Sequence, residues 1–188
     1  MANEYVSQMA ERNDMPVIDD LAERNVDFAT HRFVPGLPML PRLRTLVLGC
    51  VDPRVDPAHV LGLGVGDAAV LRNVGGRVTP DVIAQLALLG RLTQTLVGDA
   101  APVIDLIVLQ HNDCGIVRLQ DPPGMLADFF HVGPSTLRDK QVADPHEAVR
   151  ADVDALRSTP PIANRFRITG AVYDVDTGRI EISTTPTS

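Results

Sequence analysis

Three short apolar segments limit what this chain can fold into more than any other feature of its sequence. Thr45–Gly49 (TLVLG), Ala68–Leu71 (AAVL) and Asp105–Gln110 (DLIVLQ) are too short for buried helices and are rich in residues that favour strands. A nearly continuous apolar strand is buried on both faces, which is typical of parallel sheets covered by helices. We therefore predict that the three segments are parallel strands of one central sheet.

The rest of the chain carries helix and hairpin signals. Thr79, Pro80 and Asp81 predict a helix start, because they supply in turn a cap, a preset first turn and a charge that complements the helix dipole. This helix is predicted to continue to about Val97. Two further helices are predicted, one from Asn112 or Asp113 and one over Ala143–Ser158. Strands are predicted over Arg165–Asp174 and Arg179–Ser183, joined by a turn at 176–178. Strands that alternate with helices predict an α/β fold, with a central, mostly parallel sheet covered by helices.

Length and composition fit one domain over residues 1–188. Of these 188 residues, 45% are hydrophobic, which is enough to bury a core of ordinary size. No apolar run approaches the roughly 20 residues that a membrane span needs, and the polar, acidic residues 1–15 do not look like a signal peptide. We therefore expect a cytoplasmic protein that does not bind membranes. Nucleic acid is not an expected partner, because the net charge is −7 and the basic residues are scattered.

Residues 1–40 predict a helical arm. The end of this region, Phe33–Pro41, holds three prolines and a glycine, so it is not a regular element. Apolar side chains on an exposed arm are costly in water. We expect the arm to pack on a partner subunit in a dimer or a higher oligomer.

Polar side chains follow all three predicted strands. Cys50 comes directly after the first strand, Arg72 and Asn73 after the second, and His111 after the third. Because the carboxyl ends of parallel strands meet at one edge of a sheet, these side chains are expected to converge there. The sequence therefore predicts a functional site at this edge.

Cys50, His111 and Cys114 have the donor types that zinc prefers. Two thiolates and one imidazole leave the fourth tetrahedral position open, as in catalytic zinc sites. Cys114 is expected in the first turn of a helix, where the dipole favours its thiolate. Two alternatives stay open: a structural zinc site closed by Asp52 as the fourth ligand, and a non-catalytic zinc-binding or redox-sensing module in which Cys50 and Cys114 form a disulfide.

Asp52 and Arg54 supply a second functional element beside Cys50. Arg54 can hold the Asp52 carboxylate through a bidentate pair, which keeps the carboxylate ionised and off the metal. Asp52 would then orient a zinc-bound hydroxide. Asp113 is interpreted as a helix cap, and the glycine run at 62–66 is rejected as a phosphate loop because it precedes a strand.

These motifs together resemble the β-class carbonic anhydrases. The resemblance rests on Cys-x-Asp-x-Arg from Cys50, Arg-Asn-x-Gly from Arg72 and His-x-x-Cys-Gly from His111, and it covers about residues 40–120 with a weaker fit through 172–182. It implies zinc on Cys50, His111 and Cys114, an Asp52–Arg54 pair that assists catalysis, and dimers with the site near the interface. The implied activity is reversible hydration of carbon dioxide to bicarbonate and a proton.

The chain departs from the family pattern in several places. Pro53 stands where a small residue is frequent, Gly75-Gly76-Arg77 is unusual after the Arg-Asn-x-Gly motif, and there is no Trp for the bicarbonate inhibitory site of some members. Residues 120–141 match nothing in the family pattern and are expected to line or cap the entrance. Carbon disulfide or carbonyl sulfide is the alternative substrate, which a narrow apolar tunnel built by Phe129 and Phe130 would favour.

The predicted chemistry also implies a pH dependence. Two thiolates cancel the charge of Zn²⁺, so the site should acidify water less than a site with three neutral histidines. Hydration activity is therefore expected to rise above pH ~7. His59, His131 and His146 are candidates to carry the released proton, and the sequence selects none of them.

Overall fold

The computed structural model describes residues 17–98 and 101–185. The chain divides into two compact units, one up to Leu37 and one over Pro38–Ser188. In the first unit α2 (Val17–His31) is a helix in which no residue is buried. The single domain over 1–188 and the role of residues 1–40 in dimerisation stay predictions.

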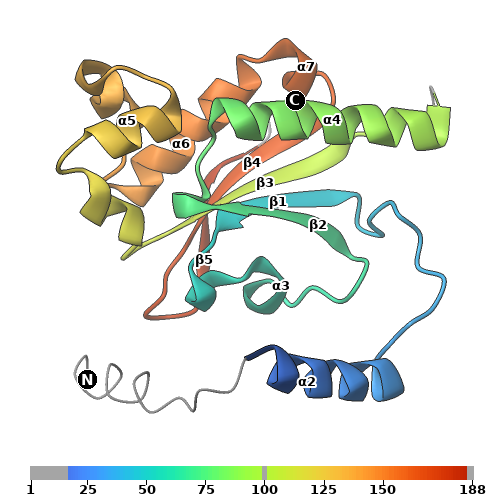
Figure 1. The fold of residues 1–188 in the computed structure, drawn as a ribbon. Helices are drawn as coiled ribbons and strands as arrows, with labels where there is room; N and C mark the ends of the chain where they lie inside the picture. Colours follow the sequence, from blue (N-terminus) through green and yellow to red (C-terminus); the bar gives the residue numbers. More distant parts are fainter. Residues whose placement is uncertain (1–16, 99–100, 186–188) are drawn as a thin grey trace. The chain divides into compact units, whose positions relative to one another are not determined.

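The second unit is built on one sheet (Figure 1). Its described strands, in the order β2-β1-β3-β4-β5, span Ala68–Asn73, Thr45–Cys50, Ile104–His111, Phe166–Tyr173 and Ile180–Thr184. The first four strands in this order run parallel, and β5 pairs antiparallel with β4. The predicted α/β fold with a mostly parallel central sheet is therefore confirmed.

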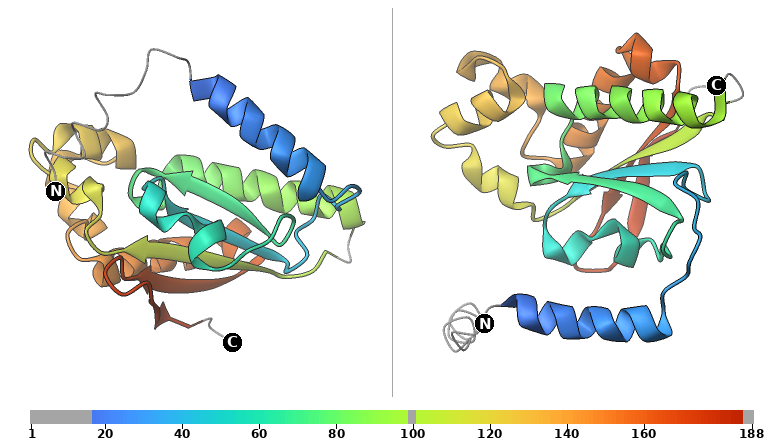
Figure 2. Two further views of the ribbon diagram at one scale, coloured as in Figure 1. Left: turned by 90° about the horizontal axis from the view of Figure 1, so that it is seen from below. Right: turned by 45° about the vertical axis from the view of Figure 1, so that its right-hand side comes forward.

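Helices cover both faces of the sheet. Figures 1 and 2 show α4, α6 and α7 on one face and α3 on the other. These helices span Pro80–Val97, Pro145–Arg157, Pro160–Ala163 and Pro57–Val60, in that order. Short elements connect the layers: η1 (Pro53–Val55), η2 (Val74–Gly76), η4 (Gly115–Leu119), α5 (Gly124–Phe130) and η5 (Pro134–Lys140).

The start of α4 is the one that the sequence predicts. The Thr79 side chain accepts a hydrogen bond from the Val82 N–H, and Pro80 is the first helical residue. The helix ends at Val97, where Gly98 adopts a φ of 69° that favours glycine. Among the described helices, none is both long and apolar enough to cross a membrane.

Successive side chains of a strand contribute to the core on opposite faces of the sheet. Leu46 and Leu48 on β1 pack in a large cluster with residues of α4 and α6, such as Leu86 and Val153. Val47, between them, belongs to a smaller cluster on the other face. Successive strand side chains point to opposite faces, so one apolar run supplies both layers. This is why the short segment at 45–49 could be read as a strand buried on both sides.

The helix predicted from Asn112 or Asp113 is wrong. Asp113 adopts a φ of 50°, in the left-handed region, and the chain then forms only the five-residue 3₁₀ helix η4. Cys114 is the residue before that helix, not part of a first α-helical turn, and no side chain caps it. A helix cannot run through a left-handed residue, so the turn after β3 has a different geometry from the predicted one.

Candidate metal centre

The candidate metal-ligating side chains lie at or just after the carboxyl ends of two neighbouring strands. Cys50 is the last residue of β1 and His111 is the last residue of β3, and these strands pair in parallel. Cys114 follows in the turn after β3. Gly76, at a φ of 61°, lets the loop after β2 lie against β1, since a Cβ there would come 2.8 Å from the Cys50 nitrogen. The predicted convergence at one edge of the sheet is observed.

The three ligand atoms have the spacing that a zinc ion requires. The atoms of Cys50, His111 and Cys114 all lie within 4.8 Å of one another, and the three residues are buried. The two Sγ atoms are 3.8 Å apart. Two zinc–sulfur bonds of about 2.3 Å at a tetrahedral angle place the sulfurs about 3.8 Å apart, whereas a disulfide needs about 2.0 Å. The geometry fits a shared metal ion and not a disulfide.

The His111 ring presents a lone pair to the same point. Its Nδ1 lies 2.8 Å from the Asn112 carbonyl oxygen, an acceptor, so Nδ1 carries the proton and donates it. Nε2 is buried and has no hydrogen-bond partner in the described part of the chain. A buried polar atom without a partner is costly, and a metal ion at this position would satisfy it.

Cys50, Cys114 and His111 shift one another's pKa values. The hydrogen bond from Cys114 lowers the pKa of the Cys50 thiol, and the same contact raises the pKa of Cys114. Burial disfavours a charged imidazole, but the neighbouring Cys50 thiolate outweighs burial and raises the pKa of His111. Two buried thiolates at this distance repel each other, so both can be ionised only with a cation between them.

Asp52 and Arg54 form the predicted bidentate pair. Arg54 donates from Nε to Oδ1 of Asp52 at 3.1 Å and from Nη2 to Oδ2 at 2.7 Å. The Arg54 backbone N–H donates to the same carboxylate at 2.9 Å. These hydrogen bonds lower the pKa of Asp52 to about 2, so the carboxylate is ionised at any physiological pH. The Asp52 backbone N–H donates to Cys50 Sγ at 3.4 Å, which ties the pair to a candidate metal ligand.

Asp113 is a second carboxylate partner of Arg54 and not a helix cap. Nη1 of Arg54 donates to its Oδ2 at 2.8 Å, and Nη2 donates to its backbone oxygen at 3.0 Å. Arg54 therefore bridges the loop after β1 and the turn after β3, and its charge lowers the pKa of Asp113. Sequence reasoning missed this contact, because aspartate favours helix caps as well as the left-handed region, and Asp113 is interpreted as a cap from the sequence.

Arg72 braces the loop that carries Asp52. Its Nε donates to the Cys50 carbonyl and its Nη2 to the Asp52 carbonyl, both at 2.8 Å. Nη1 donates to Asp56 at 2.6 Å. All three ends of the guanidinium are therefore engaged by residues 50–56. These contacts favour a bracing role for Arg72 over contact with a substrate.

The segment over 120–141 forms an apolar wall beside the cysteines. Leu126, Phe130 and Leu137 are buried in one cluster with Cys50 and Cys114. A separate cavity of about 250 Å³ adjoins the site. Among the described residues it is lined by His111, Cys114, Asp113, Val117, Arg118 and Val142, together with neighbours from α6. Neither Phe129 nor Phe130 lines this cavity, so the two rings do not form the narrow tunnel that was considered for sulfur substrates.

The histidines considered for proton transfer lie in separate places. His59 is near Asp56 (3.7 Å), His131 is near Asp81 (3.8 Å), and the His146 ring bonds Ser183 (3.1 Å). None of them shares a hydrogen bond with a metal-ligating residue in the described part of the chain. The geometry therefore selects none as the proton carrier.

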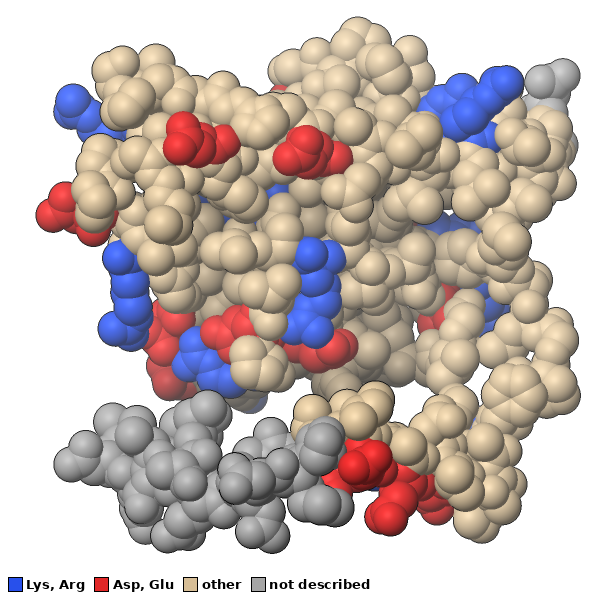
Figure 3. Space-filling view, viewed as in Figure 1, with Lys and Arg blue, Asp and Glu red and all other residues tan. Residues whose placement is uncertain are grey.

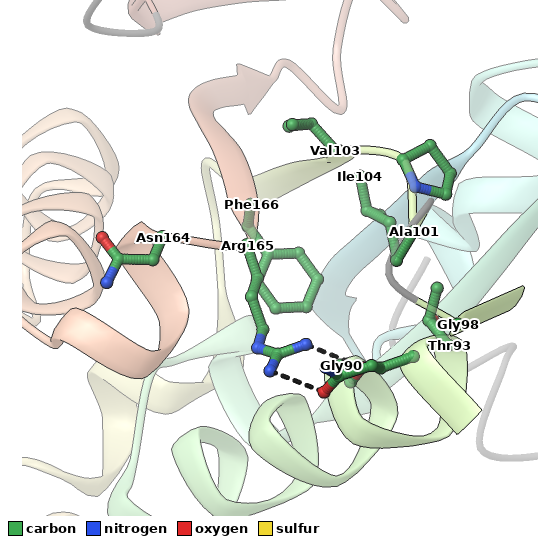
Figure 4. A pocket seen from close by; sticks show the side chains of 11 residues that line it. Gly90, Thr93, Gly98, Ala101, Val103, Ile104, Asn164, Arg165 and Phe166 are labelled. Atoms are coloured by element: carbon green, nitrogen blue, oxygen red, sulfur yellow. Dashed lines mark hydrogen bonds between the residues drawn. The ribbon is translucent and has the colours of Figure 1, made fainter.

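A second cavity, of about 300 Å³, lies at the opposite end of the sheet (Figure 4). It is formed by the last turns of α4 and the first residues of β3 and β4. Figure 4 shows the Arg165 side chain turned toward α4, where it donates to the Gly90 carbonyl oxygen (3.3 Å) and to Gln94 Oε1 (3.0 Å). This cavity has no cluster of metal-ligating side chains among its described residues.

The structure is an α/β fold in which Cys50, His111 and Cys114 could hold a metal ion at the carboxyl ends of the strands, and comparison with known proteins gives the family. A family model described as "Carbonic anhydrase" matches residues 45–180. The chain is 34% identical to "Beta-carbonic anhydrase 1" of Mycobacterium tuberculosis over 168 residues, which are 88% of this chain and 97% of the relative. The chain therefore belongs to the β-carbonic anhydrase family.

Two further matches show the range of this family. A "Carbon disulfide hydrolase" of an Acidianus species is 32% identical over 190 residues and covers 87% of each chain. The crystal structure of a carbonic anhydrase from Streptococcus mutans superposes with a TM-score of 0.69 at 31% identity, covering 92% of this chain and all of that one. Relatives that are named for different activities are thus similar to this chain.

Proposed function

We propose that the chain is a zinc-dependent carbonic anhydrase, which hydrates carbon dioxide reversibly to bicarbonate and a proton. Cys50, His111 and Cys114 would hold the ion. Zinc, when bound in such a site, makes water acidic enough to act as a nucleophile near neutral pH. The observation that carries the proposal is the 3.8 Å spacing of the two sulfurs, beside an ionised Asp52–Arg54 pair and a His111 Nε2 that has no partner among the described residues.

The chain's own residues would position the attacking water. Asp52 is ionised and accepts hydrogen bonds only, so it can take one from the water and fix its orientation. Arg54 keeps the carboxylate turned away from the ligands, and Asp113 holds Arg54 from the other side. This arrangement supports an open site over the closed form in which Asp52 is the fourth ligand.

Stopped-flow hydration of carbon dioxide by the zinc-loaded protein from pH 6.5 to 9 tests the proposal. We expect turnover that rises above pH ~7 and falls by about 10²-fold or more in Asp52→Asn with the zinc content unchanged. The matched control is Asp67→Asn, which breaks the exposed Arg42–Asp67 pair far from the ligands. No turnover by fully loaded protein would contradict the proposal.

Hydrolysis of carbon disulfide or carbonyl sulfide is the second candidate function. It is supported by the Acidianus relative, which is named a carbon disulfide hydrolase. Carbon dioxide is favoured because the solved carbon disulfide hydrolase superposes less well, with a TM-score of 0.53 against 0.69 for the Streptococcus mutans enzyme. Release of hydrogen sulfide from carbon disulfide, without carbon dioxide hydration, would favour the second candidate.

A homodimer or tetramer is part of the proposal. The face of α4 and edge strand β2 exposes Leu88, Leu92, Leu96 and Val70, and a hollow of about 370 Å³ lies between the two elements. Figure 3 shows that charged side chains are sparse over this face. An apolar face beside an unpaired strand edge suits a second copy of the chain. Sedimentation of wild type and Leu88→Glu tests this, with a smaller species expected for the variant.

Two reduced cysteines at the site favour a reducing compartment, so we propose a cytoplasmic location. Fractionation of cells that produce the full-length protein tests this, with recovery in the cytoplasmic fraction as the expected outcome.

A further inference from the structure

Arg77 is a fully buried arginine outside the metal-ligand set. Its Nε donates to Oδ2 of Asp152 at 2.7 Å, and the side chains of the two residues are 0% and 2% exposed. The Val78 N–H donates to the same carboxylate at 3.2 Å. Removing two charges from water costs about as much as their attraction returns, so a pair like this is weak evidence for stability. Its contacts indicate a more specific role.

On one side, Arg77 contacts both short helices of the apolar wall. Its Nη2 donates to the backbone carbonyl of Lys140, the last residue of η5. Its guanidinium carbon lies 5.1 Å from the ring centre of Phe130, the last residue of α5. Lys140 Nζ lies 5.4 Å from the same ring. One side chain therefore joins the ends of α5 and η5.

On the other side, Arg77 is fixed to the strands that carry the metal ligands. The Asn73 side chain bonds both the N–H and the carbonyl of Arg77, each at 2.8 Å. The Gln110 amide donates to the Gly76 carbonyl at 2.7 Å, and a Cβ on Gly76 would come 2.8 Å from the Cys50 nitrogen. Gln110 immediately precedes His111. The loop 73–77 is thus held against β1 and β3 at the metal centre.

We infer that Arg77 is a positioning residue that holds the segment 124–140 against Cys50 and Cys114. The Asp152 pair fixes the guanidinium from α6, and the bond to Lys140 and the stacking on Phe130 fix the segment. The segment supplies Leu126, Phe130 and Leu137 to the cluster that contains both cysteines. An effect of Arg77 on turnover rests on the proposed function, whereas its hold on the segment does not.

A ligand-binding role for Arg77 does not fit the geometry. Its Nη1 has no hydrogen-bond partner among the described residues, and Arg77 is one of the residues around the cavity of about 250 Å³. However, less than 1 Å² of this atom is exposed. A ligand oxygen in the cavity could not approach it closely enough for a hydrogen bond.

The test separates positioning from stability with a double variant, Arg77→Met/Asp152→Leu. Replacing a buried ion pair by apolar residues of similar size is often neutral or stabilising, so the melting temperature should stay near that of wild type. Hydrogen–deuterium exchange of the zinc-loaded protein then reports each segment separately. The matched control is Arg167→Met/Asp105→Leu, which removes a more exposed Arg–Asp pair at the other end of the sheet.

We expect amides of residues 124–141 to exchange about tenfold faster or more in the Arg77 double variant, while those of β4 stay unchanged. The control variant should leave residues 124–141 unchanged. Equal protection of this segment in wild type and the Arg77 double variant would overturn the inference. If the double variant does not fold, Arg77→Lys decides, because lysine can pair with Asp152 but lacks the planar guanidinium that stacks on Phe130 while it bonds Lys140. Faster exchange then supports the inference and unchanged exchange overturns it.

A functional readout follows where wild type hydrates carbon dioxide. Movement of the wall should lower kcat/KM in the double variant at equal zinc content and equal melting temperature. If wild type proves inactive, the exchange experiment still decides the role of Arg77, so failure of this inference and failure of the proposed function are distinguishable.

Discussion

Both ends of the sheet carry a cavity, and the two ends differ in whether their polar side chains have hydrogen-bond partners. At the amino ends of β3 and β4, Arg165 donates to the Gly90 carbonyl and to Gln94 beside a cavity of about 300 Å³. At the carboxyl ends, His111 Nε2 is buried without a partner among the described residues, and two thiols lie 3.8 Å apart beside a cavity of about 250 Å³. The larger of these two cavities is thus at the end where the arginine side chain is hydrogen-bonded. Unsatisfied ligand atoms, not cavity size, distinguish the functional end.

The largest effect is expected from substitutions at the carboxyl ends of the strands, where the proposed metal ligands lie. Cys50→Ser or His111→Ala removes one of the three ligands, so zinc affinity and carbon dioxide hydration should each fall by at least about 10²-fold. Zinc content after dialysis and stopped-flow rates measure both quantities. Retention of stoichiometric zinc in both variants would show that the ion binds elsewhere.

A smaller effect is expected for the residue that holds Asp52. Arg54→Ala releases the carboxylate from a bidentate pair and also removes the partner of Asp113, so hydration should fall by about 10- to 100-fold while zinc stays bound. Arg42→Ala is the matched control, since it loses only a pair with Asp67 far from the ligands. Equal rates in Arg54→Ala and wild type would remove the pair from the mechanism.

The strands and the ligand set could be predicted from sequence, because both depend on short-range patterns. The run at 45–49 is apolar at every position except Thr45, which predicts the strand. The prediction of the strand in turn places Cys50 at its carboxyl end. The turn after His111 was not predicted, because an aspartate is favoured both as a helix cap and in the left-handed region, so Asp113 does not distinguish the two. The buried pair of Arg77 and Asp152 spans 75 positions, and only the packing of α6 on the sheet brings its members together.

At the opposite end of the sheet, only stability should respond. Arg165→Ala loses two hydrogen bonds that join β4 to α4, which should cost about 1–2 kcal/mol of the free energy of unfolding. Zinc content and hydration rate should match wild type, since every contact removed is at the amino ends of the strands. Denaturant unfolding and stopped-flow assays measure the two expectations. Loss of activity at full zinc content would show that the contacts of Arg165 affect the site at the carboxyl ends, and would contradict the difference drawn between the two ends.

The smallest expected effect concerns pH. The pKa of Asp52 is lowered from 3.8 to about 2 by Arg54, so its contribution to stability is complete above about pH 5 and is lost as the pH falls toward 2. In metal-free protein, the stability difference between wild type and Asp52→Asn should be constant from pH 5 to 8 and should shrink below about pH 4. Urea unfolding at each pH measures it. A difference that shrinks near pH 6 would mean that Asp52 is not held by Arg54.

The most direct test of the account is a crystal structure of the zinc-loaded protein with anomalous scattering recorded at the zinc edge. The account predicts one ion bound by Cys50, His111 and Cys114, with sulfur distances of about 2.3 Å and Asp52 still paired with Arg54. An ion bound away from these residues, or Asp52 turned from Arg54 to become the fourth ligand, would contradict it.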